Sequence, residues 1–170
     1  AVATLLLENP HICCIIIGEG PLKNQCIEEV KKHSLENNIL FVGWKPKDQI
    51  SSWMSASDVL VVPTWGDEAQ GLVIAEAMFV GTPVIASNLG GIPDLVENDV
   101  SGYLCEPKST ESLTQTLRKF LSAEAKDIDR ITKQARALVE NQYSRDAVAQ
   151  KTDKLYKSIL NIDTNCCSSK

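Results

Sequence analysis

Short apolar runs alternate with amphipathic stretches along this chain, and the alternation predicts strands followed by helices. Residues 12–18 form a continuous apolar run, rich in isoleucine and ending at glycine, which is typical of a strand buried on both faces of a sheet. Similar runs predict strands at 38–43, 58–63, 82–87 and 101–107. Apolar residues at helical spacing predict helices at 21–37, 45–57, 71–80, 92–98, 110–122, 125–142 and 144–160.

Strands and helices that alternate on this scale predict an α/β domain with a parallel sheet and helices on both of its faces. Ligands of such sheets bind beyond the carboxyl ends of the strands. The loops at 18–21, 43–46, 63–72 and 87–93 each follow a predicted strand. We therefore expect these loops to converge on one edge of the sheet and to form a binding site there.

The composition is that of a globular domain with a core, since 44% of the 170 residues are hydrophobic and 23% are charged. We place the domain at 1–160 and interpret 161–170 as a polar, disordered tail. The net charge of −5 and the lack of a Lys/Arg stripe argue against a nucleic-acid partner. The apolar runs are far shorter than the ~20 residues that span a membrane, so we expect no transmembrane segment.

The six cysteines do not form a CxxC pair, and no cluster of metal ligands is visible, so we expect no metal site. We interpret the cysteines as buried thiols in a reducing compartment, which predicts a cytoplasmic protein. The chain begins at Ala1 rather than at methionine, which indicates a processed product or a fragment of a longer protein, and we favour the fragment. That parent protein could be membrane-associated.

The segment around the helix predicted at 71–80 carries the strongest candidate site. Gly71 begins this helix, whose first backbone N–H groups have no partners within the helix and therefore favour a phosphate. Glu68 precedes the helix and Glu76 lies in its second turn, flanked by Ala75 and Ala77, where a solvated charge is less expected. Two carboxylates around a phosphate site match a ligand with hydroxyl groups at both ends and phosphate in the middle, such as a nucleotide sugar. The alternative is a loop charge and a solvated helix charge.

Gly18 and Gly20 follow the first predicted strand, and Lys23 stands where a dinucleotide fingerprint would have its third glycine. A nicotinamide site is therefore disfavoured, and a simple tight turn is an open alternative to a ligand contact. Trp44, next to Lys45 at the same predicted edge, could border a base or could be a partly buried surface aromatic. Residues 90–91 similarly suit either a tight turn or a direct phosphate contact.

The segment "EAQGLVIAEAMFVGTPVIASNLGGIPDLVENDVSGYL" and the shorter pieces "GEGP", "FVGW", "ASDVLVVPT" and "GYLCEP" occur in an order that resembles one known family. This is the C-terminal domain of retaining glycosyltransferases of family 4, which have the two-domain GT-B fold. The likeness covers roughly Ala1 to Leu160. It implies a Rossmann-like parallel sheet, the C-terminal half of a GT-B fold, whose first strand is missing here before a helix in 1–10.

The resemblance also implies roles for single residues. Glu76 would bind the ribose hydroxyls of the donor, and Glu68 would be the catalytic residue that contacts the donor sugar and supports positive charge at its anomeric carbon. The donor would be a nucleoside-diphosphate sugar, bound without a metal or other cofactor. The remaining donor-binding residues fall into three groups: Gln70, Gly71 and Leu72 at the diphosphate, Gly43, Trp44 and Lys45 along the base, and Gly18 and Gly20 close to the ligand.

Two departures from the family qualify the resemblance. The family usually has an aromatic residue where Gln70 stands, and its basic pair that clamps the diphosphate has no counterpart here, since no Lys or Arg precedes Lys23. The N-terminal, acceptor-binding domain is the expected missing partner, so this fragment alone should be inactive. The intact parent is predicted to transfer a hexose with retention. The alternatives are a non-catalytic nucleotide-sugar-binding module and a GT-B sugar-nucleotide epimerase.

Overall fold

The computed structural model describes residues 1–66 and 69–160, so the expectations for Glu68 and for the tail at 161–170 lie outside the described residues. Five strands are present in the described part: β1 (Cys14–Ile17), β2 (Ile39–Gly43), β3 (Leu60–Val62), β4 (Val84–Ser87) and β5 (Tyr103–Cys105). The helices that connect and cover them are α1 (Val2–Leu6), α2 (Lys23–Lys32), α3 (Lys47–Ser55), α4 (Leu72–Val80), α5 (Ile92–Leu95), α6 (Thr110–Leu121), α7 (Ala125–Gln142) and α8 (Arg145–Ile159).

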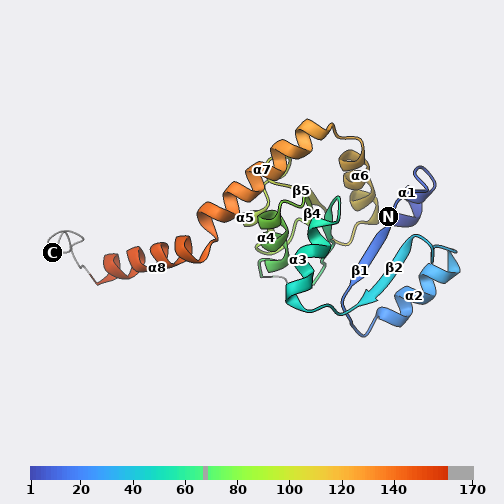
Figure 1. Cartoon of the computed structure of the whole chain (residues 1–170), viewed down its shortest axis with the longest axis horizontal. Coiled ribbons are helices and arrows are strands. Elements are labelled where there is room, and N and C mark those ends of the chain that lie inside the picture. Colours follow the sequence, from blue (N-terminus) through green and yellow to red (C-terminus); the bar gives the residue numbers. More distant parts are fainter. Residues whose placement is uncertain (67–68, 161–170) are drawn as a thin grey trace.

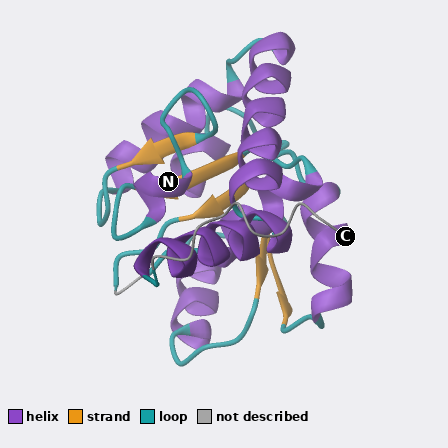
Figure 2. Ribbon diagram, turned by 90° about the vertical axis from the view of Figure 1, so that its left-hand side faces the viewer, coloured by secondary structure: helices purple, strands orange, loops and turns teal. Residues whose placement is uncertain are grey.

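All strand pairs in the described residues are parallel, which confirms the predicted α/β class. The strands form two sheets rather than the single sheet that we expected. β1 pairs with β2, while β3, β4 and β5 form a three-stranded sheet in that order. Figure 2 shows the two groups of strands separately, with the larger group surrounded by helices. The carboxyl ends of neighbouring parallel strands lie at the same edge, which is where the predicted loops begin.

The larger sheet has helices on both faces, as the sequence predicts, because β4 at its centre is buried along its whole length. Val84 and Ala86 point to one face and pack in a cluster with residues of α3, α4, α5 and α7. Ile85 points to the other face and packs with residues of α1, α6 and the first part of α7. Figure 1 shows these helices around β4 and β5.

The smaller sheet contradicts one expectation. The isoleucine-rich run predicted a strand buried on both faces, but the side chains of Ile15 and Ile16 in β1 are 39% and 38% exposed. Within the described residues β1 pairs only with β2, and neither strand contributes a residue to the two buried clusters. The apolar pattern of β1 therefore does not coincide with burial in this structure.

The N-terminal helix α1 is attached to the body of the domain through one apolar and one charged contact. Leu5 is 3% exposed and packs with Leu117 and Phe120 of α6. The guanidinium of Arg118 donates hydrogen bonds to the carboxylate of Glu8, with Nε 2.9 Å from Oε2. This hydrogen bond lowers the pKa of Glu8 below its usual value. The helix that the resemblance implied in this region is confirmed.

The last helix, α8, extends away from the rest of the molecule and follows directly on α7 (Figure 1). No helix of the described residues combines the length and the apolar character that crossing a bilayer requires.

The cysteines differ from our expectation of buried thiols. Cys105 is buried, and burial raises the pKa of its thiol, but Cys13 and Cys26 are exposed.

Candidate functional site

The first two strands bring their terminal glycines together. The backbone N–H of Gly18, after β1, donates a 3.0 Å hydrogen bond to the carbonyl of Gly43, the last residue of β2. Both residues have positive φ, 127° and 72°, which an L side chain rarely adopts. A Cβ at Gly43 would also lie 3.0 Å from Oε1 of Glu19. The two predicted site loops are therefore adjacent, as the sequence indicated.

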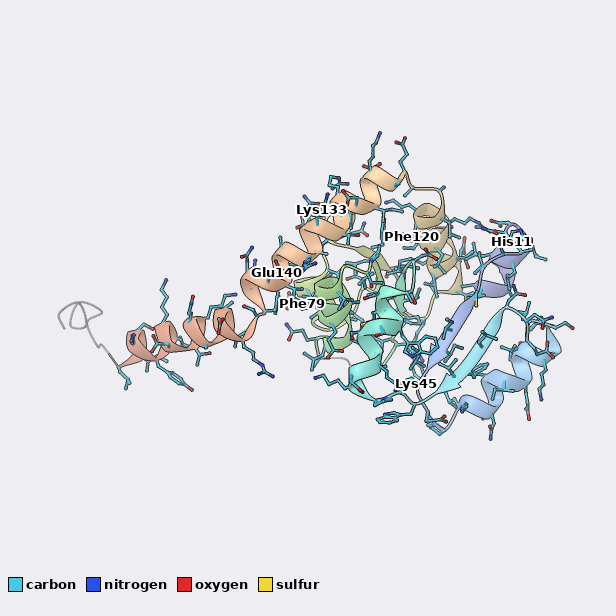
Figure 3. The ribbon with its side chains drawn as sticks, in the orientation of Figure 1. His11, Lys45, Phe79, Phe120, Lys133 and Glu140 are labelled. Atoms are coloured by element: carbon cyan, nitrogen blue, oxygen red, sulfur yellow. The ribbon has the colours of Figure 1, made fainter. Side chains whose placement is uncertain are left out.

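A groove of about 390 Å³ opens at this edge, between the ends of β1 and β2 and the helices α3 and α4. It contains four of the predicted site residues, and its full lining is Ile17, Gly18, Trp44, Lys45, Lys47, Ile50, Val73 and Glu76. Figure 3 places Lys45 between the end of β2 and the start of α3. Trp44 is 69% exposed, so it is more exposed than the partly buried aromatic of our alternative interpretation. It presents an apolar surface next to the groove.

Glu76 projects from the second turn of α4 into this groove. Its neighbours on the helix, Ile74, Ala77 and Met78, are buried against the larger sheet, which fixes the helix and leaves the glutamate on the opposite side. The carboxylate is 45% exposed, and its Oε1 lies 3.7 Å from Nζ of Lys47. The charge is thus partly solvated, in contrast to our expectation from its apolar neighbours.

Gly71 lies at the start of α4, where the sequence predicts it. Gly71 precedes the first helical residue, Leu72, and adopts a left-handed conformation with φ 68° and ψ 65°. A Cβ at this position would lie 2.8 Å from Cδ1 of Ile74. The N-cap residue, Gly71, has no side chain that could cap the helix, and the N-terminal turn of a helix favours an anion.

The glycine pair before α5 has a role that neither of our two interpretations included. The N–H of Gly91 donates a 3.0 Å hydrogen bond to the carbonyl of Ala69, in the loop between β3 and α4. A Cβ on Gly91 would lie only 2.1 Å from that oxygen. The φ of Gly91 is −86°, which any residue adopts, so the glycine is required for space rather than for conformation. This contact holds the loop that leads to Gly71.

The structure therefore brings together part of the predicted set. The groove is lined by Gly18, Trp44, Lys45 and Glu76 of this set. The carbonyl of Gly43 accepts a hydrogen bond from Gly18. Gly20 and the segment Gln70–Leu72 are not among the described lining residues. Sequence reasoning missed Ile17, Lys47, Ile50 and Val73 as site residues, although Lys47 and Ile50 follow "GWKP" closely and lie on the helix predicted at 45–57. Within the described residues no three acidic, histidine or cysteine side chains are arranged to hold a metal ion.

The residues of this chain match a known family over nearly their whole length. The Glycosyl transferases group 1 family matches residues 1–157. The chain belongs to this family. It is a family 4 domain and corresponds to the C-terminal half of GT-B glycosyltransferases. The resemblance that we described from the sequence is confirmed.

Curated relatives of this family 4 domain include glycosyltransferases and a polysaccharide synthase. The amylovoran biosynthesis glycosyltransferase AmsK of Erwinia amylovora is 34% identical over 135 residues, which are 76% of this chain and 33% of that protein. Glycogen synthase of Mycobacterium tuberculosis is 29% identical over 156 residues, which are 92% of this chain and 37% of that protein. The family 4 domain thus spans about a third of each relative.

Solved structures also resemble this domain. The C-terminal domain of a group 1 glycosyl transferase, LpcC of Francisella tularensis, aligns with a TM-score of 0.76 and 30% identity, covering 85% of this chain and 76% of that one. Anabaena Alr3699/HepE in complex with UDP-glucose aligns with a TM-score of 0.80 and 25% identity, covering 92% of this chain and 44% of that one. Relatives of this domain therefore bind UDP-sugars.

Proposed function

We propose that this chain binds a nucleoside-diphosphate sugar and is the donor-binding half of an enzyme that transfers a hexose with retention. The observation that supports this best is the groove, which collects residues from three separate segments: Gly18 after β1, Trp44 after β2 and Glu76 in α4. Such a groove, apolar with a few convergent polar groups, is the usual form of a small-ligand site.

In this proposal the three parts of the donor occupy different features of the site. The ribose hydroxyls donate hydrogen bonds to the carboxylate of Glu76, and the base lies along Trp44. The diphosphate lies at the N-terminal turn of α4, near Gly71. Glu76 is five residues beyond Gly71, which corresponds to roughly 7–8 Å along the helix axis. This spacing separates the ribose from the far phosphate, as a single extended nucleotide requires.

The chemical step in this proposal breaks the bond between the anomeric carbon of the sugar and the diphosphate oxygen. Glu68, which lies outside the described residues, would contact the donor sugar and stabilise the positive charge that develops at the anomeric carbon. The negative charge that remains on the diphosphate would be stabilised by backbone N–H groups at Gln70, Gly71 and Leu72. The reaction as proposed needs no metal ion.

Transfer to an acceptor requires more than this chain supplies in the proposal. The chain spans 33% and 37% of the two curated relatives described above. We infer that an acceptor-binding half, equivalent to the rest of those proteins, is the partner of this domain. Donor binding, rather than transfer, is therefore the appropriate measurement for the chain itself.

Thermal unfolding with a panel of UDP-, GDP- and ADP-sugars tests the proposal. A donor that binds the native state at about 100 times its Kd should stabilise the domain by about 2.7 kcal/mol. Glu76→Gln should weaken the binding of that donor about tenfold. A hydrogen bond to a charged group contributes about 1.5–3 kcal/mol when it is shielded from solvent, and less at a partly exposed carboxylate.

Glu28→Gln, which removes an exposed carboxylate from α2, is the matched control and should leave the affinity unchanged. If no nucleotide sugar stabilises the chain at millimolar concentration, the proposed function is wrong for this chain. If binding occurs but is insensitive to Glu76→Gln, the ribose assignment is wrong.

A further inference from the structure

The ion pair between Lys47 and Glu76 joins two helices across the groove. Lys47 is the first residue of α3, Glu76 lies in α4, and Nζ of the lysine is 3.7 Å from Oε1 of the glutamate. Both side chains line the groove. The carboxylate to which we assign the ribose hydroxyls is thus paired with a lysine ammonium in this structure.

This ion pair is poorly placed to stabilise the fold. The side chain of Lys47 is 92% exposed and that of Glu76 is 45% exposed, and exposed ion pairs contribute about 0–1 kcal/mol. A cation in the first turn of a helix also opposes the helix dipole. The pair can therefore be exchanged for other contacts at little cost in folding stability.

A donor in the proposed site would create an electrostatic requirement here. Its diphosphate, at the start of α4, carries at least two negative charges. These charges would lie roughly 7–8 Å along the helix axis from Glu76. Like charges at such a separation repel one another, and a nearby cation offsets that repulsion.

The groove contains two lysines, and their contacts differ. Nζ of Lys45 lies 5.9 Å from the ring centroid of Trp53, a cation–π contact that holds it against α3. Lys47 has no such aromatic contact among those found in the described residues, and its side chain is almost fully solvated. Of the two, Lys47 can reorient with less loss of existing contacts.

We propose that Lys47 is a phosphate-binding residue of this site, which pairs with Glu76 in the ligand-free chain and moves to the diphosphate when a nucleotide binds. The ribose hydroxyls then replace the ammonium at the carboxylate, and the ammonium replaces water at a phosphate oxygen. This inference rests on the proposed function, because it needs a nucleoside diphosphate in the groove. It adds a recognition residue that distinguishes a nucleoside diphosphate from a nucleoside.

Isothermal titration of the whole chain with uridine and with UDP, each at low and at moderate salt, tests the proposal. Lys47→Met should weaken UDP binding about tenfold and should make it less sensitive to salt, because one screened charge pair is lost. The affinity for uridine should stay the same or rise, because the carboxylate of Glu76 is no longer paired. Lys47→Arg should retain most of the UDP affinity.

Lys31→Met, in the last turn of α2, is the matched control and should change neither affinity. Equal losses for uridine and UDP in Lys47→Met would mean that the lysine shapes the groove rather than binds phosphate, and would overturn the proposal. Unchanged UDP affinity and salt dependence would overturn it as well, while leaving the proposed function intact. If the unmodified chain binds neither these probes nor the corresponding nucleosides and nucleoside diphosphates of guanine and adenine at millimolar concentration, both proposals are wrong.

Discussion

The backbone N–H of Gly91 lies 3.0 Å from the carbonyl oxygen of Ala69, and the two residues belong to loops that follow different strands of the larger sheet. A side chain on Gly91 would occupy the space of that oxygen. The close approach ties the segment before α5 to the loop that ends at Gly71. The position of the turn that begins α4 therefore depends on a glycine that is distant from it in sequence.

Replacement of Gly91 by alanine should displace this loop, because its Cβ would lie 2.1 Å from the oxygen of Ala69. We expect a loss of about 1–3 kcal/mol in the free energy of unfolding, the usual cost of an overpacked site. UDP affinity should also fall, since Gly71 is two residues beyond Ala69. Denaturant unfolding and titration with UDP measure the two effects.

The control for this substitution is Gly20→Ala, where a Cβ would meet no atom within 4 Å. Its stability should remain within about 0.5 kcal/mol of the original chain. Comparable stability of the two variants would show that the Ala69 loop moves freely and is not held by Gly91.

Gly71→Ala should destabilise the chain more than Gly81→Ala, although both glycines adopt a left-handed conformation, with φ 68° and 85°. Each alanine incurs the left-handed penalty of about 1–2 kcal/mol. At Gly71 the new Cβ also lies 2.8 Å from Ile74 Cδ1, whereas at Gly81 its nearest neighbour is Thr132 Cγ2 at 3.9 Å. We expect a further difference of about 1 kcal/mol in unfolding free energy.

The same two variants, Gly71→Ala and Gly81→Ala, distinguish an effect on folding stability from an effect on ligand binding. Gly71 and Gly81 lie at opposite ends of α4, so only Gly71→Ala should reduce UDP affinity beyond its effect on stability. Equal unfolding free energies would indicate that Ile74 adopts another rotamer without cost. Equal UDP affinities would contradict the placement of the diphosphate at Gly71.

Attachment of α1 should depend on pH through Glu8. The hydrogen bond from Arg118 lowers the pKa of Glu8 in the folded state. A carboxylate with a lowered folded pKa contributes stability above its unfolded pKa of about 4.3, and this contribution is lost as the pH falls through the folded value. The melting temperature of the original chain should therefore decrease more steeply than that of Glu8→Gln below about pH 4.

Melting curves between neutral and acidic pH test this, with Glu28→Gln as a control that should follow the original chain. If the original chain and Glu8→Gln lose stability in parallel, the Arg118 contact has no net effect on folding. Because the side chains of Arg118 and Glu8 are 44% and 49% exposed to solvent, added salt should diminish the difference.

Local patterns in the sequence were sufficient to predict the elements of this fold. The amphipathic pattern over 125–142 predicted α7 with the bounds that the structure has, and Gly71 was correctly expected at the start of α4. The strands are shorter than predicted, since hydrophobic runs such as 12–18 extend beyond the paired residues of β1. The division into two sheets was not predicted, because strand pairing depends on tertiary contacts.

The candidate site was predictable only in part for the same reason. Gly18, Trp44 and Glu76 can be recognised from local features of the sequence. They are, in that order, a turn glycine, an aromatic residue after a strand and an acidic residue in an apolar helix. The pairs Lys47–Glu76 and Gly91–Ala69 connect residues that are 29 and 22 positions apart. No spacing rule within one element shows such contacts, so they became visible only in the structure.

The separation of the strands into two sheets has a consequence for local unfolding. The smaller sheet, β1 and β2, contributes nothing to the two buried clusters, so its amides should exchange with solvent hydrogen through openings that leave the larger sheet intact. The groove is lined by Ile17 and Gly18 from one unit and by Val73 and Glu76 from the other. A ligand in the groove contacts residues attached to both sheets. Part of its binding free energy therefore couples the local unfolding of the smaller sheet to the unfolding of the larger one. Hydrogen exchange in β1 would then report occupancy of the groove, even if the phosphates bind at α4 as we propose.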